Sequence, residues 1–326
     1  MKNALNSAVM LAFLMMVVLA TSCDDDDDEP KLPDSISFTF GGLYPEGFDY
    51  DSRNNRFLVS SITEGDVFRV SETGTIERFT NDTRLISSTG VTVDETRNRV
   101  IVATGDVNAS KRSSTNTAFV TASIGIYDLN TGATQSFITL GDLRPNAAHF
   151  ASEATVDNSG NIYITDSFAP VIYRVDASGN KSVWLENANS FTPAQGAFGL
   201  NGIVFHPDGY LLVVKSDNGF LYKVPINNPS SFTRIDVAAY PGTDGIALDG
   251  NNNLLLAINS TNRVVRLTTN NAWASASQSG EVATPNVFPT MVNDARGDFF
   301  VLHSYLGKLL SGDLTQQTYL LEKVRF

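Results

Sequence analysis

The feature that most constrains this fold is a pattern of six repeats of about 45 residues. Each repeat combines an apolar strand, a tight turn rich in Asp or Gly, a second apolar strand and two further strands. The second strands are β-branched and aromatic and are too short for helices, as in 162–167 (IYITDS) and 210–215 (YLLVVK). The pattern predicts an all-β chain, a six-bladed β-propeller with four antiparallel strands per blade. The first turns start at Asp51, Asp94, Asp157, His206, Asp249 and Asp294.

The later strands of each repeat complete the expected ring. Third strands are expected from 66–71 (DVFRVS) in the first repeat to 307–312 (GKLLSG) in the sixth. The segment Ser35–Phe40 precedes the first repeat, and we expect it to pair with the last blade near Thr318–Val324, which would protect an open strand edge. Two packed sandwich domains are the alternative, but no linker interrupts the repeats near their middle.

Three long connections predict a functional face. In an up-and-down blade, the connection from strand two to strand three and the connection to the next blade lie on the same face. The segments Asp106–Ala122, Gly141–Ala151 and Asn187–Leu200 are connections of these two types. Long loops on one face favour a ligand there, and loop lengthening without function is the alternative.

The first 22 residues have the pattern of an export signal. Lys2 is followed by the apolar run Ala8–Ala20, which is too short to span a bilayer comfortably. The sequence Leu-Ala-Thr-Ser-Cys then resembles a bacterial lipoprotein signal, in which the cysteine, here Cys23, is lipidated and becomes the new N-terminus. An ordinary signal peptide with an incidental cysteine is the alternative. We therefore expect a signal peptide over 1–22, a lipidated acidic linker over 23–34 and a propeller over 35–326.

The acidic run Asp24–Glu29 follows the cysteine directly. It resembles the export signal of surface lipoproteins in the Bacteroidetes group, and it would also act as a self-repelling spacer. We expect an outer-membrane protein held by its lipid anchor alone, on the cell surface rather than on the periplasmic face.

Composition and motifs exclude several classes of function. The net charge of −12 argues against nucleic acid as a partner, because phosphate binding needs a basic footprint. A single cysteine excludes an internal disulfide framework and cysteine-rich zinc sites. The sequence has no GxSxG elbow, P-loop, HExxH or dinucleotide-binding glycine motif, which argues against serine hydrolase, nucleotidase, zincin and Rossmann chemistry.

One register predicts a metal site. Five residues before each first turn, the innermost strands begin at the channel mouth with Glu46, Thr89, Ser152, Asn201, Asp244 and Pro289. Residues far apart in sequence would converge there. The oxygens of Glu46, Asn201 and Asp244 suit Ca²⁺ or Mg²⁺, and zinc or copper is disfavoured. The alternative is that the three residues, each followed by Gly, form turns.

Pro45-Glu46-Gly47, Leu200-Asn201-Gly202 and Thr243-Asp244-Gly245 resemble the metal-site motifs of the regucalcin and gluconolactonase family, also called the senescence-marker-protein family. The segment 160–179 also resembles an NHL-type repeat. The resemblance covers about Leu43 to the C-terminus. It implies a divalent cation, usually Ca²⁺, at the channel mouth and an enzyme that opens sugar lactones. It also implies that Asp244 is both a metal ligand and the general base.

The third repeat departs from this family. Ser152-Glu153 stands where the family has Asn-Asp, and Phe150 stands where it has a substrate-binding arginine. Ser152 and Glu153 are expected as substitute cation or substrate contacts. His149, in a long loop, is a candidate proton carrier. Lys215 shares one strand position with Asp166 and His303 and is a candidate pocket residue, although such positions more often pack blades.

These observations lead to two functional hypotheses. The first is a cell-surface, metal-dependent lactone or ester hydrolase. The second is a non-catalytic propeller that uses the same face to bind a glycan or a protein. The intact set of Glu46, Asn201 and Asp244 favours the first, and the altered third repeat favours the second. The fold alone does not decide between them.

Overall fold

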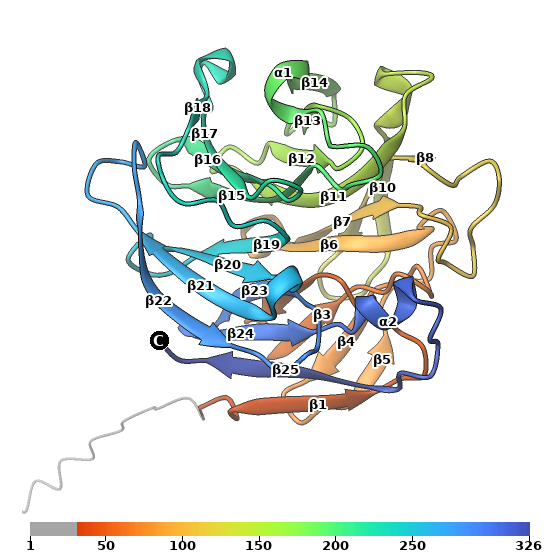
Figure 1. Ribbon diagram of the computed structural model, residues 1–326. Coiled ribbons are helices and arrows are strands. Elements are labelled where there is room, and N and C mark those ends of the chain that lie inside the picture. The colour runs from red at the N-terminus through yellow and green to blue at the C-terminus, as the bar shows by residue number, and fades with distance from the viewer. Residues whose placement is uncertain (1–30) are drawn as a thin grey trace, which may run out of the picture. The chain divides into compact units, whose positions relative to one another are not determined.

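The computed structural model describes residues 31–326. The leader, Cys23 and the acidic run lie outside the described residues. Residues Leu32–Phe326 form one compact unit of six sheets arranged around a common centre (Figure 1). The predicted six-bladed β-propeller with antiparallel four-stranded blades is confirmed.

The blades are described here from their innermost to their outermost strands. Blade 1 consists of β2 (Phe48–Asp51), β3 (Arg56–Val59), β4 (Phe68–Ser71) and β5 (Ile76–Arg78). Blade 2 consists of β6 (Ser87–Asp94), β7 (Arg99–Gly105), β9 (Ser123–Asp128) and β10 (Thr134–Thr139). Blade 3 consists of β11 (His149–Val156), β12 (Ile162–Asp166), β13 (Val171–Val175) and β14 (Lys181–Glu186). Blade 4 consists of β15 (Leu200–His206), β16 (Tyr210–Lys215), β17 (Phe220–Pro225) and β18 (Thr233–Arg234). Blade 5 consists of β19 (Thr243–Leu248), β20 (Leu254–Ile258), β21 (Arg263–Thr268) and β22 (Ser277–Ala283). Blade 6 consists of β23 (Pro289–Ala295), β24 (Asp298–His303), β25 (Thr318–Val324) and β1 (Ser35–Thr39).

The ring closes through the first strand of the chain. Strand β1 pairs antiparallel with β25, with Ser35 opposite Glu322 and Thr39 opposite Thr318, as predicted. Ile36 and Phe38 of β1 are buried in the core between blades 6 and 1. Because β1 is the outermost strand of blade 6, residues from both ends of the described chain complete one sheet and hold the ring shut (Figure 1).

The third strand of blade 6 differs from the prediction. Residues 307–312 do not form a strand; they belong to α2 (Leu306–Leu310) and the turn after it, and β25 is the third strand. The apolar pair Leu309-Leu310 suggested a strand, but Leu310 is exposed on the helix. The connection from β24 to β25 is therefore another long loop, and the sequence analysis missed it.

Apolar packing between neighbouring blades stabilises the ring. Separate buried clusters occupy each of the six blade interfaces. The interface of blades 5 and 6, for example, packs Leu255 and Val264 against Val292 and Val301. Every blade therefore buries both of its faces, and the centre of the ring is left to polar side chains.

The remaining elements are short. They are β8 (Val120–Thr121), which pairs in parallel with β11, α1 (Ala188–Phe191), and the 3₁₀ turns η1 (Glu95–Arg97), η2 (Gly141–Leu143), η3 (Pro229–Ser231) and η4 (Asn259–Thr261). Within residues 31–326, no helix is long and apolar enough to span a membrane.

Candidate functional site

Irregular strand pairing positions the candidate site. In β6, β11, β15, β19 and β23 the register with the second strand of the blade shifts close to the N-terminal end of the innermost strand. In β6, β11, β15 and β19 the shift includes the residue predicted to face the channel, such as Asn201 between Leu200 and Ile203, and Asp244 between Thr243 and Ile246. In β23 the predicted Pro289 pairs with His303 and the shift falls on the two residues after it, so the predicted register is wrong by one residue in this blade. A bulge re-aims a side chain out of the regular pleat, so these shifts direct the predicted residues toward the axis.

The glycines after the predicted ligands are packing residues. Gly202 and Gly245 lie within β15 and β19, and neither these two nor Gly47 has a positive φ. A Cβ atom at Gly202 would lie 2.4 Å from the carbonyl oxygen of Asp244, and one at Gly47 would lie 2.7 Å from that of Thr89. Neighbouring innermost strands can approach this closely only without a side chain between them. The alternative that these pairs form turns is therefore wrong.

Gly202→Ala is expected to lower the free energy of unfolding by about 1–3 kcal/mol, because backbone on two adjacent strands must move. Gly250→Ala is the matched control. A Cβ atom at Gly250 meets nothing within 4 Å, and this glycine has no positive φ. Denaturant unfolding of both variants measures the difference. Equal stability of the two variants would contradict the close-approach argument.

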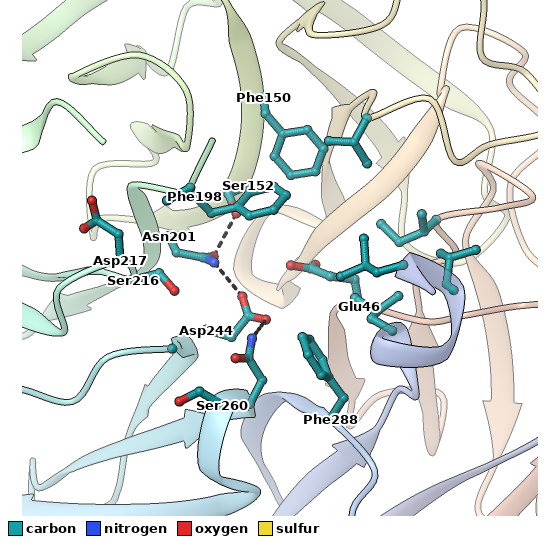
Figure 2. A pocket seen from close by; sticks show the side chains of 18 of the residues that line it. Glu46, Phe150, Ser152, Phe198, Asn201, Ser216, Asp217, Asp244, Ser260 and Phe288 are labelled. Atoms are coloured by element: carbon teal, nitrogen blue, oxygen red, sulfur yellow. Dashed lines mark hydrogen bonds between the residues drawn. The ribbon is translucent and has the colours of Figure 1, made fainter. Parts of the chain in front are cut away.

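A chain of hydrogen bonds joins blades 3, 4 and 5 at the channel mouth (Figure 2). Ser152 Oγ donates to Asn201 Oδ1 at 2.8 Å, and Asn201 Nδ2 donates to Asp244 Oδ1 at 2.6 Å. Asn259 Nδ2 donates to the other oxygen, Asp244 Oδ2, at 3.0 Å. Two amides therefore hold the Asp244 carboxylate in one orientation on the wall of a pocket of about 450 Å³.

Glu46 faces this chain from the opposite side of the pocket (Figure 2). It is buried, with 6% of its surface exposed, and Oε2 has no hydrogen-bond partner among residues 31–326. Its backbone N–H donates to Ser60 Oγ, which ties the residue to the end of β3. A buried carboxylate oxygen without a donor is costly, so this oxygen requires an explanation beyond packing.

The electrostatics of the channel favour a bound positive charge. Burial, with repulsion from Glu153 and Asp244, raises the pKa of Glu46 well above its usual range. Burial, with repulsion from Asp244 and Asp49, does the same to the pKa of Glu153. Burial also raises the pKa of Asp244 to about 7, against the hydrogen bonds from Asn259 and Asn201. Without a cation, these carboxyl groups resist ionisation.

The residues at the channel mouth fit a hard divalent cation by their chemistry. Glu46 and Asp244 supply carboxylate oxygens, Asn201 supplies an amide oxygen, and all three line the same pocket. Within residues 31–326, no three His, Cys, Asp or Glu side chains cluster closely enough to form a metal site by themselves. The predicted set has only two such residues, so the amide of Asn201 would be an essential ligand.

Residues 44–292 match the SMP-30/gluconolactonase/LRE-like region. The chain belongs to this family. No curated protein matches it by sequence.

Solved structures share the fold with this family member at low identity. The major Malassezia sympodialis allergen Mala s 1 has 16% identity and a TM-score of 0.71, over 90% of this chain and 97% of the allergen. A luciferin-regenerating enzyme has 13% identity and a TM-score of 0.62, over 90% and 97% of the two chains. A putative gluconolactonase has 13% identity and a TM-score of 0.60, over 89% and 92%. At these identities the likeness shows the fold alone.

Glu153 lies away from this pocket. In this member of the family, Ser152 lines the pocket at the channel mouth, whereas Glu153 lines a smaller cavity of about 220 Å³ together with Asp49. Repulsion from Glu153 nevertheless helps to raise the pKa of Glu46 at the channel mouth. Asp49 is held by Asn293 Nδ2 and by the backbone N–H of Val93, so Glu153 is the less constrained acid of that cavity.

His149 and Lys215 do not line the pocket at the channel mouth. His149 is buried, with Nδ1 2.7 Å from Asp166 Oδ2 and Nε2 3.0 Å from the carbonyl oxygen of Arg144. Lys215 Nζ lies 2.6 Å from both carboxylate oxygens of Asp217. Asp217 lines the pocket and Lys215 stands behind it, so Lys215 acts on the pocket only through Asp217.

His149→Phe is expected to cost about 1–3 kcal/mol of stability, because Asp166 loses its imidazole partner. Burial lowers the pKa of His149, but the bonds to Asp166 and to the Arg144 carbonyl outweigh burial and raise it above 6.5. The pair stabilises the fold fully below the unfolded-state pKa, and that stability is lost as pH rises through the folded-state pKa. Denaturant unfolding at about pH 6 and about pH 9 checks this. A difference between wild type and variant that grows toward high pH would contradict it.

Sequence reasoning missed Asn259 and Ser216, which both line the pocket. They stand one residue beyond the position shared by Asp166, Lys215 and His303 on the second strands. Neighbouring residues on a strand face opposite sides, so the pocket residues are found by moving one position along. A polar residue one position after the end of a second strand was the signal in the sequence that could have identified Asn259 and Ser216.

The three long connections identified from the sequence contribute to the wall of this pocket. Val107 and Ala109 come from the first long connection, Phe150 comes from the C-terminal end of the second, and Phe198 comes from the third; all four line the pocket. The loop that contains α2 adds Leu306, Leu309 and Leu310. This end of the channel is therefore covered mainly by apolar side chains.

Proposed function

We propose that this chain hydrolyses a lactone or an ester with the help of Ca²⁺ or Mg²⁺ held by Glu46, Asn201 and Asp244. The buried, unpartnered Oε2 of Glu46 carries the proposal. An acceptor of this kind, facing a second carboxylate across a pocket, is satisfied by a positively charged ligand. Oxygen donors alone suit a hard cation. Membership of the SMP-30/gluconolactonase/LRE-like family supports the same reading.

A cation bound there would polarise the substrate carbonyl and lower the pKa of a nearby water. Side chains of the protein orient the general base and exclude water. Asn201 and Asn259 hold the two oxygens of Asp244, so this carboxylate is oriented to accept a proton from water. Phe150, Phe198 and Phe288 line the pocket and exclude bulk water from it.

The proposed reaction is a simple hydrolysis. The water oxygen bonds to the carbonyl carbon, and Asp244 takes the proton that water loses. The bond between that carbon and the ring or alkoxy oxygen breaks, and the proton passes from Asp244 to the departing oxygen. A lactone yields one hydroxy acid, and an ester yields an acid and an alcohol.

A turnover screen of lactones and aryl esters tests the proposal. We expect hydrolysis with Ca²⁺ present, loss of hydrolysis with EGTA and recovery when Ca²⁺ is returned. Calorimetric titration with Ca²⁺ runs in parallel. Metal binding without turnover of any substrate would favour the second hypothesis, a propeller that binds a glycan or protein partner. Neither binding nor turnover would refute the metal site as well.

We also propose that the chain is exported and anchored by lipid at Cys23, on the outer membrane and at the cell surface. The leader and the acidic run Asp24–Glu29 support this. Cys23→Ser is expected to move the protein from the membrane pellet to the soluble fraction, because no acyl chain can then be attached. Protease treatment of intact cells checks surface exposure of the wild type. A variant that still sediments with the outer membrane would contradict the anchor.

A further inference from the structure

An apolar groove continues the pocket at the channel mouth. It has a volume of about 870 Å³, and it shares Val107, Phe198, Leu309 and Leu310 with the pocket. Among residues 31–326, no charged residue lines the groove, and Asn108 and Gln195 supply the only polar side chains there. The cavity system is therefore polar and acidic at the channel end and apolar along the rest of its length.

Aromatic side chains run from the pocket into the groove. The rings of Phe150 and Phe198, which line the pocket, lie 5.5 Å apart, and Phe168 packs on both at 5.5 and 5.2 Å. Phe119 extends the cluster at 6.2 Å from Phe168, and it is 48% exposed. This continuous aromatic wall connects the buried carboxylates with the surface of the protein.

The far side of the groove is exposed apolar surface. Leu310 is 62% exposed and Leu314 is 64% exposed, and both line the groove beside α2. An apolar patch that opens into a cavity indicates a binding site, whereas scattered exposed leucines would not. Phe119 at one end of the groove and Phe288 in the pocket both have left-handed backbones, with φ of 62° and 53°. Such strain in bulky residues is concentrated at ligand sites.

We propose that the substrate is a neutral lactone or ester that carries a long, unbranched acyl chain. This inference rests on the proposed function and names its substrate class. The carbonyl would lie beside Asp244, and the chain would follow Phe150 and Phe198 into the groove, ending near Leu314. The groove offers no cation to a phosphate or carboxylate tail, and it has too few polar side chains for a polyhydroxylated one. An apolar acyl chain can pack against nearly every side chain that lines the groove.

Chain length provides the test. Hydrolysis of acetyl, butyryl, octanoyl and dodecanoyl nitrophenyl esters, and of alkyl-substituted lactones, is measured with Ca²⁺ present. We expect kcat/KM to rise by about fourfold for each methylene that the groove covers. Leu310→Gln and Leu314→Gln should flatten this rise, so that the long-chain esters lose more kcat/KM than the acetyl ester does. Phe326→Gln is the matched control, because Phe326 is 42% exposed and lies outside the groove.

A binding experiment separates this inference from the proposed function. Phenylnaphthylamine, a neutral apolar fluorophore, is titrated into the wild-type protein and displaced with acyl lactams of increasing length. Displacement that strengthens with chain length and weakens in Leu310→Gln supports the groove, even if no ester is hydrolysed. Turnover that is independent of chain length, with both leucine variants unchanged, would overturn the acyl-chain proposal but would still support the proposed hydrolase function. Absence of length-dependent displacement would overturn it as well.

Discussion

Asp244→Asn is expected to lower kcat for lactone or ester hydrolysis by about 100-fold or more. The substitution keeps the shape of the side chain and one oxygen for the cation. It removes the negative charge and the ability to accept a proton from water. It also places an amide against Asn201 Nδ2 and Asn259 Nδ2, which donate to Asp244 at 2.6 and 3.0 Å. Two donors would then face one another at one of these contacts, so the orientation of the residue is lost with its basicity.

Steady-state kinetics at saturating Ca²⁺ measure this effect, and calorimetry shows how much metal binding remains. Ser260→Ala is the control on the pocket wall, because Ser260 Oγ donates to the carbonyl oxygen of Pro241 and not to Asp244. We expect the control to keep its activity. An Asp244→Asn enzyme with wild-type kcat would refute Asp244 as the base and would leave it at most a metal ligand.

The repeat pattern predicted the ring because it repeats one local rule. The same turn and strand chemistry recurs six times, so equivalent side chains of different blades reach the channel mouth, although in blade 6 the register lies one residue later than predicted. Placing Glu46, Asn201 and Asp244 around one pocket needed only a common register. Closure by β1 followed from an extra strand before the first repeat, which could protect an open strand edge by pairing with the last blade.

The parts that escaped prediction depend on contacts between repeats. Helix α2 is five residues long, too short to be stable by its own propensity, so tertiary contacts decide its existence. The hydrogen bond from Asn259 to Asp244 joins η4, which directly follows β20, to the innermost strand β19 and leaves no local signal. The pairing of His149 with Asp166 likewise links the first residue of β11, which the sequence placed in a long loop, to β12. The groove brings loops of different blades together, which periodicity does not describe.

Removal of the cation is expected to lower the melting temperature by about 5 °C near neutral pH. A cation that binds only the folded state stabilises it by about 2.7 kcal/mol at a hundredfold excess over Kd. For a chain of this length, each kcal/mol corresponds to about 2 °C. Thermal unfolding with Ca²⁺ and with EGTA measures the difference. Glu46→Gln should abolish it, because this substitution removes one of only two carboxylates at the site.

The size of this effect should depend strongly on pH. Burial raises the folded-state pKa of Glu46 and Glu153, and it raises those of Asp244 and Asp49 to about 7. In the metal-free protein these groups therefore contribute stability that is fully present below about pH 4, where they are protonated in both states. That stability is lost as the pH rises through the folded-state pKa values, because the buried groups must then ionise close together.

The cation reverses this loss by supplying the missing positive charge. The melting temperatures with Ca²⁺ and with EGTA should therefore converge near about pH 5, where protons compete with the cation, and separate toward about pH 8. Glu153→Gln removes one buried charge outside the pocket at the channel mouth, so it should stabilise the EGTA-treated protein at the higher pH and keep a response to Ca²⁺. A response to Ca²⁺ that is equal at both pH values would mean that the ion binds elsewhere than among these carboxylates.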